Sequence, residues 1–173
     1  GHWSRFEQYP NHLFLIFRTL EAPYTPKSRT ERVSYFYFPQ SQVLLTYRNE
    51  PVEYVERAWE SFRGGSCIWL WQQLVDRGVE TFFEYVESLT DRLEDLEELA
   101  LDGDDTNQVP RQVFAARREV LRIRRLVSQA REALLHLERL PELGSDAYMF
   151  RDLTDRIGRV YEGLDAARDE LSN

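Results

Sequence analysis

The stretch VDRGVETFFEYVESLTDRLEDLEELALDGDDTNQVPRQVFAARREVLRIRRLVSQAREALLHL, residues 75–137, contains two apolar repeats separated by a short polar segment. The first repeat steps alternately by four and three residues, through Val75, Val79, Phe82, Val86, Leu89, Leu93, Leu96 and Ala100. The second repeat has the same spacing, through Val109, Val113, Ala116, Val120, Ile123, Val127, Ala130, Leu134 and Leu137. This spacing is typical of helices that pack along one seam. Because the connection is short, we predict an antiparallel, coiled-coil-like helical hairpin.

The charges of the two predicted helices are opposite. Between Glu80 and Asp105 there are eleven acidic residues and one arginine, whereas residues 106–140 contain eight arginines and three glutamates. Side by side, an acidic and a basic helix would neutralise each other along their flanks. Exposed ion pairs contribute only about 0–1 kcal/mol each, so we expect an effect on register and partner choice more than on stability.

The chain before the hairpin is rich in β-branched and aromatic residues. Three runs bounded by proline and serine predict strands, at residues 12–20, 32–38 and 42–48. The run from Leu13 to Phe17 is apolar throughout, which predicts a strand covered on both faces. A short helix is expected at residues 51–63, ended by a glycine pair, with Ser66 able to cap the next helix.

A third long helix is predicted after the hairpin. Its seam follows the same rule, through Phe150, Leu153, Ile157, Val160, Leu164, Ala167 and Leu171. We therefore expect a single α+β domain, in which a small β-sheet packs with long helices. Its parts are a β-rich region at 1–50, helices with the acidic and basic hairpin at 51–140, and a long helix at 145–173.

Composition excludes several classes of protein. A length of 173 residues suits one domain, and a net charge of −8 argues against general nucleic-acid binding. The single cysteine, Cys67, excludes an internal disulfide framework and fits a reducing compartment. No run of 18 apolar residues and no signal peptide is present, so we expect this chain to be soluble and intracellular.

No catalytic or common metal motif emerges. The histidines His2, His12 and His136 share no metal-ligand spacing with one another or with Cys67. Neither a glycine-rich phosphate loop nor a Ser/His/Asp set is marked out, so an enzyme is not expected. Residues 102–113 depart from a calcium loop and are interpreted as a solvated hairpin tip. Three aspartates there could still hold hydrated divalent ions loosely: Asp102, Asp104 and Asp105.

Five segments, in this order and spacing, resemble the cytoplasmic portion of the CorA-type divalent-cation channels. They are SRFEQYPNHLFLIFR (4–18), RVSYFYFPQSQVLLTYRNEP (32–51), IWLWQQLVDRGVETFFEYVESLTDRLEDLEELAL (68–101), REVLRIRRLVSQAREALLHL (118–137) and AYMFRDLTDRIGRVYEGLDAARDEL (147–171). The resemblance implies that the last segment starts a stalk helix leading to the membrane. The family's two membrane helices and Gly-Met-Asn motif are absent from this chain, as are its early strands.

The resemblance implies a function. The chain would be the cytosolic sensing and gating domain of a homopentameric magnesium transporter, on the cytoplasmic face of the inner membrane. A zinc transporter of the same fold is one alternative, and a soluble coiled-coil interaction domain is another. As part of a stalk, the last seam residues are expected to be exposed for neighbouring subunits: Leu164, Ala167 and Leu171.

The resemblance also implies regulatory metal ligands at subunit interfaces. Asp152 and Asp76 fall on aspartates of the family, and Glu80 and Asp155 lie one turn further along the same predicted helices. The implied ion is Mg²⁺, with Co²⁺ or Zn²⁺ as other divalent candidates, because carboxylates can bind Mg²⁺ that retains several waters. Arg156 places a cation beside this site where some members have histidine. Ordinary salt bridges with arginine are the alternative interpretation of Asp76 and Asp152.

Overall fold

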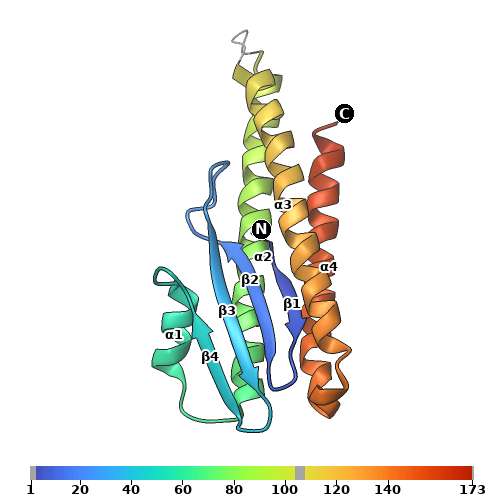
Figure 1. Cartoon of the computed structure of the whole chain (residues 1–173). Helices are drawn as coiled ribbons and strands as arrows, with labels where there is room; N and C mark the ends of the chain where they lie inside the picture. The colour runs from blue at the N-terminus through green and yellow to red at the C-terminus, as the bar shows by residue number, and fades with distance from the viewer. Residues whose placement is uncertain (1–2, 104–107, 173) are drawn as a thin grey trace.

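A computed structural model describes residues 3–103 and 108–172. It shows a four-stranded sheet beside three long helices, with a short helix at one edge of the sheet (Figure 1). The prediction of an α+β domain with a small sheet and long helices is confirmed. Within the described residues, no helix is both long and apolar enough to cross a membrane.

The sheet is antiparallel throughout, with the strands in chain order. They are β1 (Arg5–Gln8), β2 (Leu13–Leu20), β3 (Thr30–Phe38) and β4 (Val43–Tyr47). The last three confirm the predicted strands. The first was not predicted, because four residues that include two charges carry too little β pattern by themselves.

Helices cover only one face of the sheet (Figure 1). Along β2 the burial alternates: Leu13, Leu15 and Phe17 are buried, whereas Phe14 and Ile16 are partly exposed. The prediction that both faces of this strand are covered is therefore wrong. Cross-strand aromatic packing explains the apolar residues on the open face, since the Phe14 and Phe36 rings lie 4.7 Å apart.

Five helical segments follow the sheet. They are α1 (Glu53–Ser61), α2 (Cys67–Leu101), α3 (Gln108–Glu138), the 3-10 segment η1 (Pro141–Asp146) and α4 (Ala147–Glu170). Ser66 caps α2 as predicted, accepting a hydrogen bond from the Trp69 backbone N–H at 3.2 Å. Helices α2 and α3 form the predicted antiparallel hairpin, and most of their seam residues are buried.

The helix α4 packs against both arms of this hairpin (Figure 1). Its whole apolar seam is buried, which contradicts the expectation that Leu164, Ala167 and Leu171 are exposed. The hairpin of the same chain supplies the covering surface, so these residues need no neighbouring subunit. Arg117 on α3 reaches the end of this seam and donates to the Leu171 carbonyl at 2.6 Å.

The predicted neutralisation between the acidic and basic helices does not take the form of direct ion pairs. In residues 3–103 and 108–172, the one pair that joins α2 to α3 links Arg92 to Glu119 and so has the opposite polarity. Two arginines of α3 contact other parts of the chain instead. Arg124 pairs with Asp165 on α4 at 2.6 Å, and Arg125 lies over the Trp3 ring.

Candidate functional site

The contact between α2 and α4 brings three of the four predicted metal-site residues, Asp76, Glu80 and Asp152, near one another. Asp76 and Glu80 lie one turn apart on α2, and Arg156 on α4 bridges them. One Arg156 Nη atom donates to Asp76, and the other lies 2.5 Å from Glu80 Oε2. The guanidinium also lies 5.0 Å from the centroid of the Phe83 ring. These contacts hold a positive charge where the sequence resemblance implied a metal ion.

The carboxylates differ in burial. The Asp76 side chain is 34% exposed, and its burial raises its pKa, an effect that the Arg156 cation opposes. The neighbouring charges of Glu80 and Asp152 raise the same pKa further. Asp76 therefore lies in an environment that favours an adjacent cation.

Asp152 and Asp155 are exposed on α4. Asp152 is near enough to affect Asp76 electrostatically, but neither it nor Asp155 belongs to an ion pair between described residues. The structure thus joins Asp76 and Glu80 through Arg156 and places Asp152 near Asp76, whereas no ion pair or hydrogen bond between described residues links Asp155 to this group. The salt-bridge interpretation describes Asp76 correctly and Asp152 incorrectly.

A single chain does not form a complete metal cage at this position. Across the described parts of the chain, no group of three or more His, Cys, Asp or Glu side chains is arranged to hold a metal ion. The available ligands are carboxylate oxygens alone, the donor type that Mg²⁺ prefers. Any ion bound here would need further ligands, such as water.

The remaining sequence candidates do not join this site. His12 stacks on Tyr9 with ring centroids 4.7 Å apart, and Cys67 lies against the Gln42 carbonyl, 2.8 Å from it. His136 lies in the last turn of α3. His2, Asp104 and Asp105 lie outside the described residues, so the hairpin tip as a loose ion site stays a prediction.

A second charged cluster was not predicted. Glu119 of α3 has a side chain only 1% exposed, and it accepts hydrogen bonds from Arg92 at 2.7 and 3.0 Å and from the Tyr85 hydroxyl. Both partners belong to α2. The signal available in the sequence was weak, because Glu119 is one of three glutamates in the arginine-rich helix α3 and Arg92 is one of two arginines in α2.

Known structures share this fold. The full-length CorA magnesium transporter from Methanocaldococcus jannaschii aligns with a TM-score of 0.81 and 18% identity, over 98% of this chain and 56% of that protein. Full-length CmaX aligns with a TM-score of 0.82 and 18% identity, over 99% of this chain and 55% of that protein. The ZntB cytoplasmic domain from Vibrio parahaemolyticus aligns with a TM-score of 0.79 and 16% identity, over 99% of this chain and 70% of that chain.

The chain therefore spans slightly more than half the length of the two full-length proteins. At such identities these alignments show the fold alone. A sequence search among curated proteins finds no match. The family model described as CorA-like Mg²⁺ transporter protein matches residues 1–173, the whole chain. This chain accordingly belongs to the family of CorA-like Mg²⁺ transporter proteins.

Proposed function

We propose that this chain is the cytosolic sensing and gating domain of a homopentameric divalent-cation transporter, on the cytoplasmic face of the inner membrane. Its family is one of transporters, and it spans 56% of the full-length CorA magnesium transporter. The proposal assigns membrane passage to sequence outside these residues and gives the present domain a regulatory role. Neither role requires catalysis.

The observation that carries this proposal is the cluster of carboxylates around Arg156. Asp76 and Glu80 on α2 share that one guanidinium, and Asp152 on α4 lies beside them without an ion pair among the described residues. Mg²⁺ usually binds proteins through one or two carboxylates and keeps several waters. An exposed Asp152 is suited to such binding, with further ligands supplied by the adjacent subunit.

In the proposed sensor, Arg156 competes with the metal ion for the carboxylates of Asp76 and Glu80. In the structure, the guanidinium holds Asp76 and Glu80 and joins α4 to α2. A bound divalent ion offers these carboxylates another cation and offsets repulsion between subunits. Because α4 extends for 24 residues, about 36 Å, a change in its contact with α2 would be felt far from the site. Ion binding and helix position would then be coupled in both directions.

The ligand type favours Mg²⁺ over Zn²⁺. Carboxylate oxygens are hard ligands that suit Mg²⁺, whereas zinc sites in proteins commonly use cysteine and histidine. The likeness to a ZntB domain keeps zinc transport as the second candidate. Co²⁺ is a further candidate ion, and all three ions can be compared in one assay.

Thermal unfolding of a complete cytoplasmic domain during titration with each ion, at constant ionic strength, tests the site. We expect millimolar Mg²⁺ to raise the melting temperature and Asp152→Asn to reduce that rise. Glu170→Gln, which removes an exposed carboxylate near the end of α4, is the matched control and should respond like the parent. Equal responses in all three proteins would remove Asp152 from the proposed site.

The transporter role has a separate test in the gene. The sequence after Asn173 should encode two apolar segments of about 20 residues, with Gly-Met-Asn after the first. Uptake of Mg²⁺ by cells that produce this longer protein, compared with uptake of Zn²⁺, then distinguishes the two transport proposals. An open reading frame that stops near Asn173 would contradict both.

A further inference from the structure

Two arginines face each other on the open side of the sheet. The β2–β3 register pairs Arg18 directly with Arg32, and the neighbouring pair is Thr19 with Glu31. Because Phe17 and Thr19 are buried under the helices, strand alternation places Arg18 and Arg32 on the opposite, open face. Like charges directly opposite each other on adjacent strands destabilise a sheet. Such a pair calls for a neutralising partner.

Glu21, Glu31 and Glu50 line the cavity beside this pair, but among the described residues none of these glutamates forms an ion pair with it. Neither arginine takes part in an ion pair with a described carboxylate. Arg18 Nη1 donates to Thr30 Oγ1 at 2.7 Å, while its Nε is buried without a hydrogen-bond partner in residues 3–103 and 108–172. Burial and the neighbouring Arg32 charge both lower the pKa of Arg18. A buried charged donor left unpaired carries a free-energy cost.

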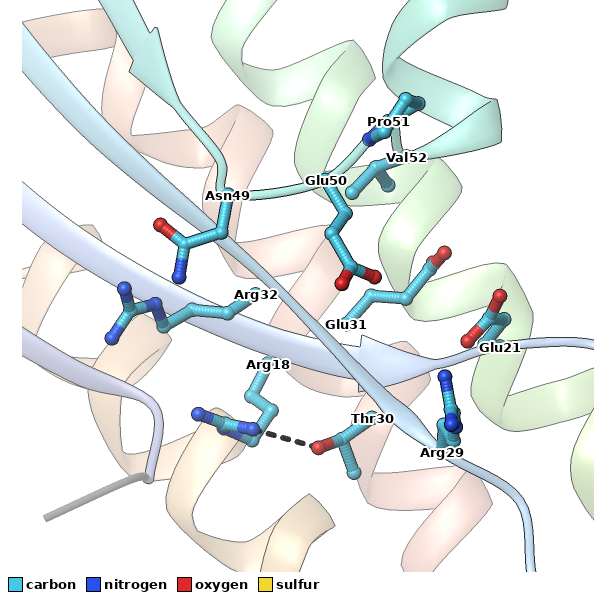
Figure 2. A pocket seen from close by; sticks show the side chains of 10 residues that line it. All are labelled: Arg18, Glu21, Arg29, Thr30, Glu31, Arg32, Asn49, Glu50, Pro51 and Val52. Carbon is cyan, nitrogen blue, oxygen red and sulfur yellow. Dashed lines mark hydrogen bonds between the residues drawn. The ribbon is translucent and has the colours of Figure 1, made fainter.

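A cavity of about 530 Å³ lies beside this pair (Figure 2). Figure 2 shows the two guanidinium groups and the Asn49 amide extending toward one end, away from Glu31. Glu31 points to the other face of β3 because it is one residue out of phase with Arg32. The lining also includes Arg29 and the carboxylates of Glu21 and Glu50, so three arginines and three glutamates line the cavity in all. Arg18, Arg32 and Asn49 form its donor-rich end.

We propose that Arg18 and Arg32, assisted by Asn49, bind the phosphate group of a small ligand at this end of the cavity. The planar guanidinium matches the spacing of phosphate oxygens and donates two parallel hydrogen bonds. A phosphate dianion offsets two positive charges, whereas one carboxylate offsets one. The remaining volume admits either inorganic phosphate with water or the body of a phosphate ester.

Isothermal titration of the chain with inorganic phosphate, at constant ionic strength set by chloride, tests the proposal. We expect saturable binding that Arg18→Gln and Arg32→Gln each weaken by about tenfold or more. Arg29→Gln is the matched control, because this exposed arginine lines the same cavity and is outside the cross-strand pair. Its affinity for phosphate should equal that of the parent chain.

Two further probes identify the ligand. Tighter binding of glycerol 3-phosphate than of phosphate would assign a phosphate ester, and equal binding would assign free phosphate. Succinate that binds as tightly as phosphate would overturn the assignment to phosphate. Absence of saturable phosphate binding, or equal weakening by Arg29→Gln and Arg18→Gln, would overturn the site itself.

Stability without ligand gives an independent readout. Arg32→Gln removes the like-charge pair, so it should raise the melting temperature of the phosphate-free chain while abolishing the rise that phosphate produces. If the arginine had a purely structural role, its replacement would lower that melting temperature. A lowered melting temperature of phosphate-free Arg32→Gln would therefore contradict the proposal.

Discussion

Helix α2 makes two charged contacts that differ in burial. Toward α3, the Glu119 side chain is 1% exposed, and both of its oxygens are occupied by Arg92 and Tyr85. Toward α4, Asp76 and Glu80 are 34% and 52% exposed and share the single cation of Arg156. The carboxylate of the first contact is shielded from water, whereas the carboxylates of the second are open to it, although Arg92 at 27% is more exposed than Arg156 at 19%. Under the proposed function, the contact with exposed carboxylates is the one where a metal ion would replace the arginine.

The contact with the shielded carboxylate predicts the largest effect. Arg92→Met leaves the Glu119 carboxylate buried without its cation, so we expect a loss of about 3 kcal/mol in the free energy of unfolding. Urea denaturation measures this loss. Arg118→Met, at an exposed position of α3, is the control and should stay within about 0.5 kcal/mol of the parent.

The double variant with Arg92→Met and Glu119→Leu distinguishes a lost attraction from an unpaired buried charge. Because a buried ion pair is often replaceable by apolar side chains, the double variant should regain part of the lost stability. If it is less stable than Arg92→Met alone, the cost does not come from the unpaired charge, and the contrast between the two contacts fails.

The position of α2 against the sheet sets where its open carboxylates lie. Gly78, between Asp76 and Glu80 in sequence, is so close to β2 that an added Cβ would lie 2.9 Å from atoms of Phe17 and Thr19. Gly78→Ala should therefore cost about 1–2 kcal/mol in thermal or urea unfolding, despite the better helix propensity of alanine. Gly158→Ala on α4 is the control, with its nearest atoms at 3.9 Å, and should be neutral or stabilising. Equal costs at both positions would argue against a close approach at Gly78.

The contact with exposed carboxylates predicts a smaller loss and a gain of ion response. Arg156→Gln removes the shared cation, and since the pair is only partly buried we expect a loss of about 1 kcal/mol without Mg²⁺. Under the proposed function, Mg²⁺ should then raise the melting temperature more than in the parent, because its competitor is gone. Arg159→Gln, an exposed arginine on the same helix, is the control. A response to Mg²⁺ equal to that of the parent would show that Arg156 does not compete with the ion for these carboxylates.

The sequence predicted the features that depend on hydrophobic periodicity, namely which faces of the long helices are buried. The seams of α2, α3 and α4 are buried mostly as their spacing indicates, because core packing fixes which face of a helix points inward. It did not predict which element covers a seam, so Leu171 was expected to be exposed. The pairing of Arg156 with Asp76 joins positions 80 residues apart, and no local pattern encodes such a distance. The same holds for Glu119, whose partner is set by how the hairpin packs.

Glu31 extends the comparison to a carboxylate that the described arginines approach without pairing. Glu31 has no ion pair among the described residues, and burial together with the charges of Glu21 and Glu53 raises its pKa to about 7. The folded chain therefore holds a proton there that the unfolded chain, with an ordinary pKa of 4.5, releases earlier. This group's contribution to stability is complete below about pH 4.5 and is lost as the pH rises to 7.

Glu31→Gln keeps the shape of the side chain and removes this titration. At pH 8 the variant should be more stable than the parent by about 0.5 kcal/mol, a small value because water screens a partly exposed group. At pH 4 the two should be equally stable, as measured by urea unfolding across the pH range. Glu60→Gln, an exposed position on α1, should show no pH-dependent difference. A gain that is the same at pH 4 and pH 8 would mean that packing, and not the lack of an ion pair, separates Glu31 from the paired carboxylates of α2.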